Sequence, residues 1–493
     1  MPKIEIDGRT VEAAEGATVL KAAESVGVAI PHFCYHPAFA PEGSCRMCAV
    51  EVEGSPKLEL ACSMVVREGL KVRTASPAVR EARRSVLEFF LADHPIDCPI
   101  CDKAGECRLQ DYYFEYGLTE SRFAEAKERK DKKVKIGEKL ILDRERCIQC
   151  TRCVRFLAEV TRTHELGVVE RGVHSEIATF PGELVRSSDS GNLVDLCPVG
   201  AITDTDFRFK TRPWFLKRSD SICPLCSRGC NIVIDHHPGI PRVPDSRRIY
   251  RIRPRENAAV NGHFICDHGR YGFVALHRNG RRERIGWAPS AGADSAPPWE
   301  QALDFAAEKC LALRGAGKAG RIGVVLTSQM TNDELALARN VFVRGLGAGT
   351  VAFADPPDGP AAGILLHAER SPNRAGAAAL GFDLRAADPD ALAGGTDLLF
   401  VFGTNILAAH PFERIQAAFG PIRTKILLTA HETDLSRLAD LILPVAAPAE
   451  TSGSFTNADG IIQRFEAAVV PCGDTRSAAD ILAGLAARLG VKP

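Results

Sequence analysis

Apolar and polar residues alternate near the start of the chain, as they do in a short β-hairpin. Residues 3–13 carry this alternation, and Asp7-Gly8 lies at its middle, where a two-residue turn favours these residue types. Residues 18–27 (TVLKAAESVG) then have the spacing of a helix, and a loop rich in Gly, Pro and Cys follows. This order of elements predicts a β-grasp, ferredoxin-like module over residues 1–77.

Helical periodicity returns at residues 78–93, where apolar side chains recur on one face. This amphipathic helix leads into a second group of cysteines, so we expect a module over residues 78–117. Residues 120–139 are dense in charge and lack periodicity, which predicts a solvated connector. Two further cysteine-rich modules are expected over residues 138–210 and 216–272.

The pattern changes at about residue 285. Residues 287–299 (WAPSAGADSAPPW) have the composition of a linker. Beyond them a helix with Asn332 near its start is expected, together with four buried strands, at 321–328, 397–405, 424–430 and 439–444. Short apolar strands separated by helices predict a doubly wound parallel sheet in residues 285–493. Ser452-Gly453-Ser454 is expected to form a tight turn. The predicted fold class is therefore multidomain, α+β and then α/β.

Composition narrows the functional classes. Lys+Arg and Asp+Glu both number 62 among the 493 residues, so net charge gives no argument for nucleic acid. No apolar run approaches the ~18 residues that a transmembrane helix needs. The first residues lack an apolar signal core, so we expect a cytoplasmic protein without a membrane span.

Cysteine placement indicates metal chemistry. Of the 17 cysteines, only Cys310 and Cys472 follow Cys266. A disulfide framework fits poorly, because the chain is long and its cysteines come in C-x2-C groups. The choice is therefore between zinc and iron–sulfur. Cys310 lies in a helical stretch and is expected to be a buried structural thiol.

The first candidate ligand set has the spacing C-x10-C-x2-C-x13-C and consists of Cys34, Cys45, Cys48 and Cys62. Plant-type [2Fe-2S] ferredoxins have a shorter first gap. Four thiolates also suit zinc, but the preceding β-grasp pattern favours a [2Fe-2S] cluster.

The second set, H-x3-C-x2-C-x5-C, consists of His94, Cys98, Cys101 and Cys107. Zinc with three Cys and one His is chemically possible. A histidine on an iron cluster would raise its potential, since a neutral ligand replaces an anion.

The third set is C-x2-C-x2-C with a remote Cys-Pro, formed by Cys147, Cys150, Cys153 and Cys197. This is the ferredoxin pattern for a [4Fe-4S] cubane, and it is the most specific signal in the chain.

The fourth set consists of Cys223, Cys226, Cys230 and Cys266, with the spacing C-x2-C-x3-C-x35-C. The predicted cofactors are thus one [2Fe-2S] and three [4Fe-4S] clusters.

These motifs resemble a known family, the NuoG-like large iron–sulfur subunit of bacterial NADH:quinone oxidoreductase, complex I. Residues 31–48, 98–110 and 146–156 resemble its first three cluster loops, with Ala104 where Gly or Ser is usual. Residues 222–230 and 265–272 resemble the extra cubane site of some bacterial members. Residues 439–465 resemble the molybdopterin-oxidoreductase tail, which we expect to be a shortened form here.

The resemblance implies an electron relay. Electrons from NADH would enter from a flavin-bearing subunit and pass through the [2Fe-2S] centre, the Cys147 cubane and the His94 cubane toward quinone. The fourth cluster would lie off this route. The implied partners are the flavin/NADH-binding subunit, a thioredoxin-like [2Fe-2S] subunit and a ferredoxin-like two-cubane subunit. The implied location is peripheral, on the cytoplasmic side of the bacterial inner membrane.

Alternatives within the same redox class are the iron–sulfur subunit of a soluble formate dehydrogenase or of an NAD-reducing hydrogenase. The tail offers no persuasive thiol ligand for molybdenum, so neither molybdenum nor a pterin is expected. A structural zinc protein is the non-redox alternative.

Overall fold

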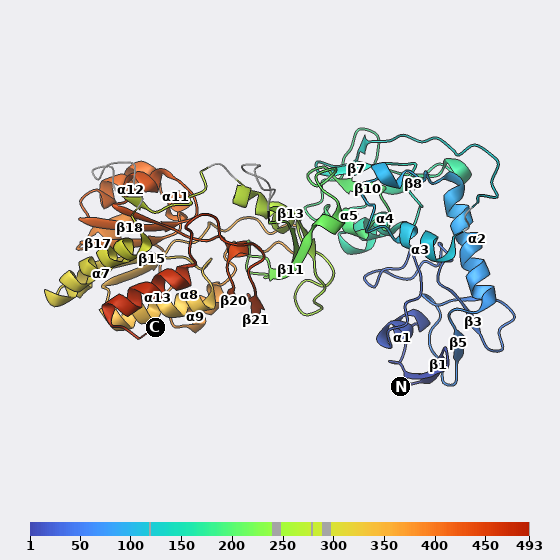
Figure 1. The fold of residues 1–493 in the computed structure, drawn as a ribbon, viewed down its shortest axis with the longest axis horizontal. Coiled ribbons are helices and arrows are strands. Elements are labelled where there is room, and N and C mark those ends of the chain that lie inside the picture. The colour runs from blue at the N-terminus through green and yellow to red at the C-terminus, as the bar shows by residue number, and fades with distance from the viewer. Residues whose placement is uncertain (118–119, 239–247, 278–279, 288–296, 493) are drawn as a thin grey trace. The chain divides into compact units, whose positions relative to one another are not determined.

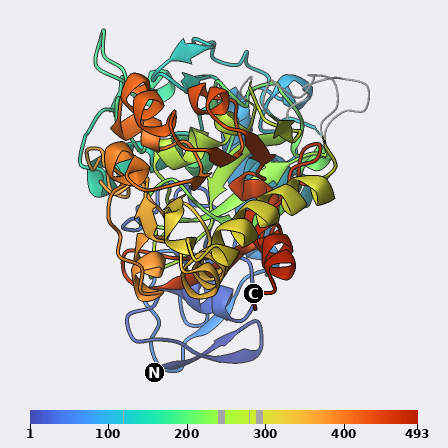
Figure 2. The same ribbon diagram turned by 90° about the vertical axis from the view of Figure 1, so that its left-hand side faces the viewer.

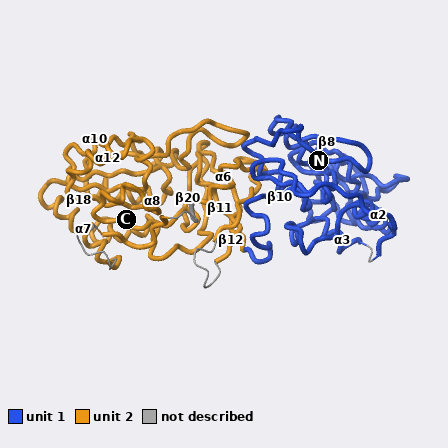
Figure 3. The backbone as a smooth tube through the Cα atoms, turned by 90° about the horizontal axis from the view of Figure 1, so that it is seen from above, with its two compact units in different colours: residues 1–216 blue, residues 217–493 orange. Residues whose placement is uncertain are grey.

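The computed structural model describes residues 1–117, 120–238, 248–277, 280–287 and 297–492. The chain divides into two compact units, Met1–Leu216 and Lys217–Pro493 (Figure 3). Most of the predicted linker, residues 288–296, lies outside the described residues. No helix in the described ranges is long and apolar enough to cross a membrane.

Unit 1 begins with the predicted β-grasp module (Figure 1). Its five-stranded sheet has the order β2-β1-β5-β3-β4. The elements are β1 (Lys3–Ile6), β2 (Arg9–Glu12), α1 (Val19–Ser25), β3 (Ala49–Val52), β4 (Glu59–Leu60) and β5 (Lys71–Arg73). Asp7 (φ 47°) and Gly8 (φ 80°) are both left-handed, as a two-residue hairpin turn requires. The hairpin and the helix are confirmed.

Two helices carry the chain away from this module. Ser76 caps α2 (Pro77–Asp93) by accepting a hydrogen bond from the Val79 N–H, and Pro77 occupies its first position. The predicted helix over residues 78–93 is therefore confirmed. A 3₁₀ turn, η1 (Cys98–Ile100), leads to α3 (Arg108–Tyr116), which packs against α2.

The rest of unit 1 consists of short elements around loops. A three-stranded sheet, β10-β7-β6, and a hairpin, β8-β9, are connected by loops and short helical segments, which include η3 (Gly172–His174) and η4 (Pro213–Phe215). The elements are β6 (Val134–Lys135), β7 (Leu140–Leu142), α4 (Arg152–Arg155), η2 (Phe156–Val160), β8 (Gly167–Val169), β9 (Glu176–Ala178), α5 (Asn192–Leu196) and β10 (Ile202–Asp204). Residues 120–133 contain no helix or strand, as predicted for a connector, but the predicted span to residue 139 was too long, because Val134–Lys135 form β6 and Ile136 is buried.

Unit 2 opens with an antiparallel sheet of β11 (Lys217–Ile222), β12 (Asn231–His236) and β13 (Ile249–Pro254). The short helix α6 (Asp267–Tyr271) packs against β13. Asp235 of β12 is buried between Arg251 and Arg253, which neighbour it on β13.

The larger part of unit 2 is a doubly wound α/β domain. Its six-stranded sheet has the order β14-β19-β18-β17-β15-β16, and it is parallel except at β14. The strands are β14 (Gly286–Trp287), β15 (Ile322–Leu326), β16 (Thr350–Phe353), β17 (Leu398–Phe402), β18 (Thr424–Thr429) and β19 (Leu441–Pro444). The four strands expected from the sequence are therefore confirmed.

Alternate residues of each strand contact opposite layers of helices. One layer holds α7 (Trp299–Gly315), α8 (Asn332–Ala338) and α13 (Ala478–Leu489), with α7 and α13 side by side (Figure 1, Figure 2). The other holds α10 (Pro389–Ala393), α11 (Ile406–Ala409) and α12 (Phe412–Phe419). Phe400 packs against the first layer and Leu399 against the second, as the period of two along a strand demands.

Asn332 is the first residue of α8, next to the N-cap, so the expectation that it lies near the start of this helix is confirmed. The N-cap itself is Thr331, whose side chain forms a reciprocal capping box with the Glu334 carboxylate. One other local expectation was wrong. The predicted turn at Ser452-Gly453-Ser454 instead enters β20 (Gly453–Thr456), which pairs with β21 (Ile462–Phe465).

Candidate metal centres

The first ligand set forms two thiol pairs within the β-grasp module. The thiols of Cys34 and Cys45 share a hydrogen bond, and so do those of Cys48 and Cys62. The hydrogen bond from Cys45 lowers the pKa of Cys34 to about 5, and the one from Cys48 lowers the pKa of Cys62. Two adjacent pairs of thiols suit a site with two metal ions that each take two thiolates.

The loop that carries this set bends tightly. Gly43 has φ 72°, and a Cβ there would lie 3.1 Å from Cδ1 of Leu60. The backbone N–H of Phe33 donates to Sγ of Cys45 at 3.4 Å. Hydrogen bonds of this kind to ligand sulfur tune the potential of an iron–sulfur centre.

The second set surrounds the end of α2. His94 is the C-cap residue of α2, and Nδ1 of its imidazole is buried without a hydrogen-bond partner in the described structure. Burial lowers the pKa of His94 to about 4, so the ring is neutral at pH 7 and has a lone pair available for a metal. Cys98 lies on η1, whereas Cys107 is the N-cap residue of α3.

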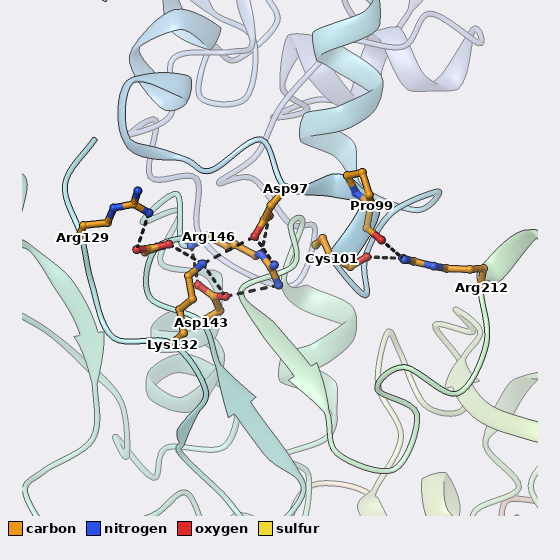
Figure 4. A network of polar contacts seen from close by, with 9 residues as sticks. Asp97, Pro99, Cys101, Arg129, Lys132, Asp143, Arg146 and Arg212 are labelled. Atoms are coloured by element: carbon orange, nitrogen blue, oxygen red, sulfur yellow. Dashed lines mark hydrogen bonds and ion pairs between the residues drawn. The ribbon is translucent and has the colours of Figure 1, made fainter. Parts of the chain in front are cut away.

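Three neighbouring residues shape this site. Arg146 acts electrostatically on both His94 and Cys101, which places these candidate ligands around one buried cation. A Cβ at Gly200 would collide with Sγ of Cys101, so only glycine leaves room for that sulfur. Arg212 donates to the carbonyl oxygens of Pro99 and Cys101, each at 2.5 Å, and so fixes the segment between Cys98 and Cys101 (Figure 4).

Arg146 is itself held by a network of charges (Figure 4). Its guanidinium binds Asp97 through two hydrogen bonds, of 2.5 and 3.0 Å, and lies 3.5 Å from Asp143. Lys132 bridges Asp97, Asp143 and Glu145 at 3.8, 3.6 and 2.5 Å. Such paired charges are stable when buried because each is compensated within the network.

The third set lines one small cavity. Cys147, Cys150, Cys153 and Cys197 all reach it, together with apolar side chains that include Ile148 and Val199. The intervening residues Gln149 (φ 53°) and Thr151 (φ 54°) are left-handed, which folds the C-x2-C-x2-C segment into a compact loop. Burial raises the pKa of Cys147 to about 12 and of Cys150 to about 11. A metal is therefore needed to keep these sulfurs as thiolates at pH 7.

The fourth set lies in unit 2, on the loop between β11 and β12 and at the start of α6. The backbone N–H of Cys223 donates to the carbonyl oxygen of Cys230 at 2.8 Å, which closes the loop. Cys266 is the N-cap residue of α6, and its Sγ accepts a hydrogen bond from the Gly269 N–H at 3.4 Å. A Cβ at Gly269 would lie 3.1 Å from Sγ of Cys223 and 3.7 Å from Sγ of Cys266, so a glycine leaves space between these sulfurs.

The charges of Cys226, Cys230 and Cys266 act on the Cys223 thiol, so the side chains of these four cysteines lie close together. Among the described residues, no three or more His, Cys, Asp or Glu side chains lie close enough to hold one metal ion. In a cubane, by contrast, each thiolate binds a different iron atom. The donor chemistry of the four sets suits iron–sulfur clusters, and Gly200 and Gly269 leave space beside sulfurs of the second and fourth sets.

Sequence reasoning missed two arginines beside the first and third sets. Arg152 is 4% exposed, and its guanidinium donates to the carbonyl oxygens of Tyr35 and Leu196, neighbours of Cys34 and Cys197. Arg155 donates to the carbonyl oxygen of Cys34 and, at 2.9 Å, to that of Ala40. The sequence did indicate that these arginines have partners elsewhere in the fold, because no acidic residue lies between Cys147 and Ala158 to pair with them.

Other thiols do not join a site. Cys310 is fully buried among apolar residues of α7, as predicted for a structural thiol. Cys472 is partly buried and lies beside Glu450.

Five known domain types match this chain in sequence. They are a 2Fe-2S iron-sulfur cluster binding domain (residues 2–77), the NADH-ubiquinone oxidoreductase-G iron-sulfur binding region (83–122), the ferredoxin-like domain of NADH-quinone oxidoreductase subunit 3 (137–203), the molybdopterin oxidoreductase Fe4S4 domain (216–277) and molybdopterin oxidoreductase (357–488). The chain therefore contains 2Fe-2S and 4Fe-4S cluster-binding domains.

Individual relatives agree with these domains. The NADH-quinone oxidoreductase subunit designated G 2 in Rhizobium meliloti is 38% identical over 342 residues, which are 69% of this chain and 39% of the relative. The mitochondrial NADH dehydrogenase [ubiquinone] iron-sulfur protein 1 of Solanum tuberosum is 40% identical over 351 residues, 69% of this chain and 46% of the relative. The chain thus matches less than half the length of these relatives.

A solved structure of an NAD+-reducing [NiFe]-hydrogenase in the H2-reduced state matches with 32% identity and a TM-score of 0.40, covering 43% of this chain and 91% of that chain. The sequence relatives and the iron–sulfur domains are what identify the family. This chain is a homologue of the NuoG-type iron–sulfur subunit of NADH-quinone oxidoreductase.

Proposed function

We propose that this chain is the iron–sulfur electron-relay subunit of an NADH:quinone oxidoreductase, whose whole complex couples electron transfer to proton translocation. The chain takes electrons from a flavin-bearing partner at the first ligand set. It passes them through the third set to the second set, and from there toward quinone. The chain itself has no complete active site in this proposal.

The observation that carries the proposal is that these three sets form a continuous series within unit 1. The charge of Cys34 acts on Cys150, so the first and third sets are close. The backbone N–H of Arg108, next to Cys107, donates at 3.1 Å to the carbonyl oxygen of Pro198, next to Cys197. The second and third sets are therefore joined by one backbone hydrogen bond. A relay needs this order of neighbours, whereas isolated structural metal sites do not.

We assign the clusters by set. The proposed ligands are Cys34, Cys45, Cys48 and Cys62 for a [2Fe-2S] cluster; His94, Cys98, Cys101 and Cys107 for a [4Fe-4S] cluster; Cys147, Cys150, Cys153 and Cys197 for a second; and Cys223, Cys226, Cys230 and Cys266 for a third. Such clusters supply one-electron redox chemistry when bound. The chain holds the ligands, excludes water from them and places cations near them.

We further propose five modules with the bounds 1–77, 78–117, 138–210, 216–272 and 285–493. The fourth set belongs to unit 2, and we assign its cluster a role in folding and assembly rather than in the relay. Residues 285–493 would bind neither molybdenum nor a pterin. Cys310 supports this assignment, because it is completely buried and cannot reach a substrate or a cofactor.

The proposed partners are the flavin/NADH-binding subunit, a thioredoxin-like [2Fe-2S] subunit and a ferredoxin-like two-cubane subunit. The proposed location is the cytoplasmic face of the bacterial inner membrane, as a peripheral subunit. The support is the naming of the curated relatives as subunits of NADH-quinone or NADH-ubiquinone oxidoreductase.

The test compares two cysteine variants in the assembled complex. Cys150→Ala removes a ligand from the proposed relay, so NADH-to-quinone transfer should stop while ferricyanide reduction at the flavin continues. Cys226→Ala should lower the yield of assembled complex but leave turnover per assembled complex within about twofold. Equal loss of turnover from correctly assembled complexes of both variants would contradict the proposed roles.

A further inference from the structure

Unit 2 contains a cavity of about 360 Å³ at the edge of its parallel sheet. Thr327, Gly403, Ala430 and Val445 line it, and each directly follows a strand, namely β15, β17, β18 and β19. The carboxyl edge of a doubly wound sheet is where this fold binds ligands. The opposite wall comes from the β11–β13 sheet, so the cavity lies between two layers of the same unit.

The walls of this cavity are mainly apolar. Ile232, Ile234 and Ile252 line one side, and Phe402 and Leu428 line the other. The polar groups at the sheet edge already have partners. The Thr429 hydroxyl donates to the carbonyl oxygen of His431 at 2.9 Å, and the Gln329 amide oxygen accepts from the Asn405 amide at 2.9 Å.

The cavity also lacks what a phosphate needs. None of its lining residues in the described part of the chain is Lys or Arg, and Glu334 is the one carboxylate among them. Helix α8 follows β15 at the place where such folds commonly bind phosphate through helix N–H groups. Here the Glu334 carboxylate accepts the Thr331 N–H at 2.8 Å, and the Thr331 hydroxyl accepts the Glu334 N–H at 3.2 Å. The chain's own groups therefore occupy the anion position.

We propose that this cavity binds an uncharged, largely apolar organic molecule of two or three rings. Its volume lies in the range of small-molecule pockets, ~300–1,000 Å³, and its mainly apolar lining is typical of them. An anionic ligand would lose its hydration and meet no Lys or Arg among the described lining residues. The pyrophosphate of a pterin dinucleotide would meet the same lack of Lys and Arg among the described lining residues.

The proposed ligand would lie beside the fourth ligand set. Gly269 and Leu225 line the cavity, and Gly269 faces Sγ of Cys223 and Cys266. Binding would therefore change the surroundings of those sulfurs, although the proposal concerns the cavity alone and does not rest on the relay function.

The test is photolabelling of the full chain with benzophenone, an uncharged two-ring probe that reacts preferentially with methionine. Met330 lines the cavity, and the chain has only 4 methionines. Met1, which is 78% exposed, reports non-specific labelling, and Met47, which is fully buried, reports unfolding. Matched competitors are 2-naphthol, which is uncharged, and 2-naphthyl phosphate, which carries the same rings with an anion.

We expect saturable labelling of Met330 that 2-naphthol reduces at least tenfold and that 2-naphthyl phosphate reduces less than twofold. Ala430→Phe, which fills the cavity, should abolish it, whereas Ala417→Phe on the exposed face of α12 should not. Labelling of Met330 that does not saturate, or equal protection by the phosphate, would overturn the proposal. The competition uses the unaltered chain, so it decides the matter even if Ala430→Phe fails to fold.

Discussion

The buried arginine between the first and third ligand sets should raise the potentials of both centres. Arg152 donates hydrogen bonds to the carbonyl oxygens of Tyr35 and Leu196, one residue away from Cys34 and Cys197. Burial and Arg108 lower the pKa of Arg152 to about 10, so its guanidinium is charged at pH 7. A cation stabilises the reduced form of an iron–sulfur centre, because that form carries one more negative charge.

The size of the effect follows from Coulomb's law. A cation roughly 10 Å from a centre contributes about 1.7 kcal/mol at an effective dielectric constant of ~20. For a one-electron couple this corresponds to roughly 70 mV. Arg152→Leu should therefore lower both midpoint potentials by roughly 40–90 mV, the range reflecting the unequal distances to the two centres.

The assay is an EPR-monitored redox titration of the complex. Arg152→Lys keeps the charge and loses part of the hydrogen bonding, so its potentials should stay within roughly 30 mV of the parent values. Arg171→Leu is the matched control, because Arg171 belongs to the same unit and is exposed. Its potentials should not change.

The comparison separates charge from packing. A structural role alone would make Arg152→Leu and Arg152→Lys equally disruptive, with broadened or missing EPR signals. Intact signals whose potentials move by less than about 20 mV in Arg152→Leu would refute the electrostatic reasoning. A change in the same direction at both centres is required, since one cation serves both.

Three further outcomes are expected. His94→Cys should keep its cluster but lower the potential by on the order of 100 mV, because a thiolate replaces a neutral ligand; His94→Ala should lose that EPR signal, and His174→Ala, an exposed histidine, should match the parent. The reconstituted chain should hold about 14 iron atoms with stoichiometric sulfide. It should contain no molybdenum, and acid oxidation should release no pterin. A stable content near ten iron atoms, or zinc in place of iron, would reject the assignment of four clusters. Asp235→Asn should cost about 3 kcal/mol of unfolding free energy by removing the buried carboxylate charge that pairs with Arg251 and Arg253, whereas Asp383→Asn in an exposed pair should not measurably change chemical denaturation.

Asp235 also predicts a pH dependence. Burial alone would raise its pKa, but the hydrogen bond from Arg253 and the charges of Arg251 and Arg253 bring it below the ordinary value. A carboxyl whose pKa is lower in the folded state stabilises that state above its unfolded pKa. The contribution should be present at pH 7 and be lost as the pH falls below about 4. In denaturation curves, Asp235→Asn should therefore lie far from the parent at pH 7 and approach it in acid.

Local patterns carried much of the fold prediction. The Asp7-Gly8 turn and the four buried strands were predictable because turn chemistry and apolar runs act over a few residues. The pattern located Asn332 near the start of α8 but did not identify the cap residue, since Thr331 and Asn332 are both good capping residues in isolation. Only the reciprocal bond with Glu334 separates them.

The charge-dense connector shows where composition misleads. Residues 120–133 are largely exposed, as expected, yet Lys127 donates at 3.1 Å to the carbonyl oxygens of Ala92 and His94 at the end of α2. Lysine near a helix C-terminus satisfies carbonyls that have no partner within the helix. The connector thus ties down the segment that carries His94, and a charge count alone does not show which lysine does so.

The cavity of unit 2 could not be predicted from the sequence, for a different reason. Ile234 and Leu428 have the pattern of ordinary core residues, because a wall that faces a ligand and a wall that faces another side chain bury apolar surface in the same way. What separates them is the missing packing partner, which depends on two different sheets, in which β12 and β18 are about 200 residues apart in sequence. The role of Glu334 could not be predicted from the sequence either, since a capping carboxylate excludes phosphate only if the helix end faces a cavity. The labelling of Met330 therefore tests a property of the assembled unit that no local pattern specifies.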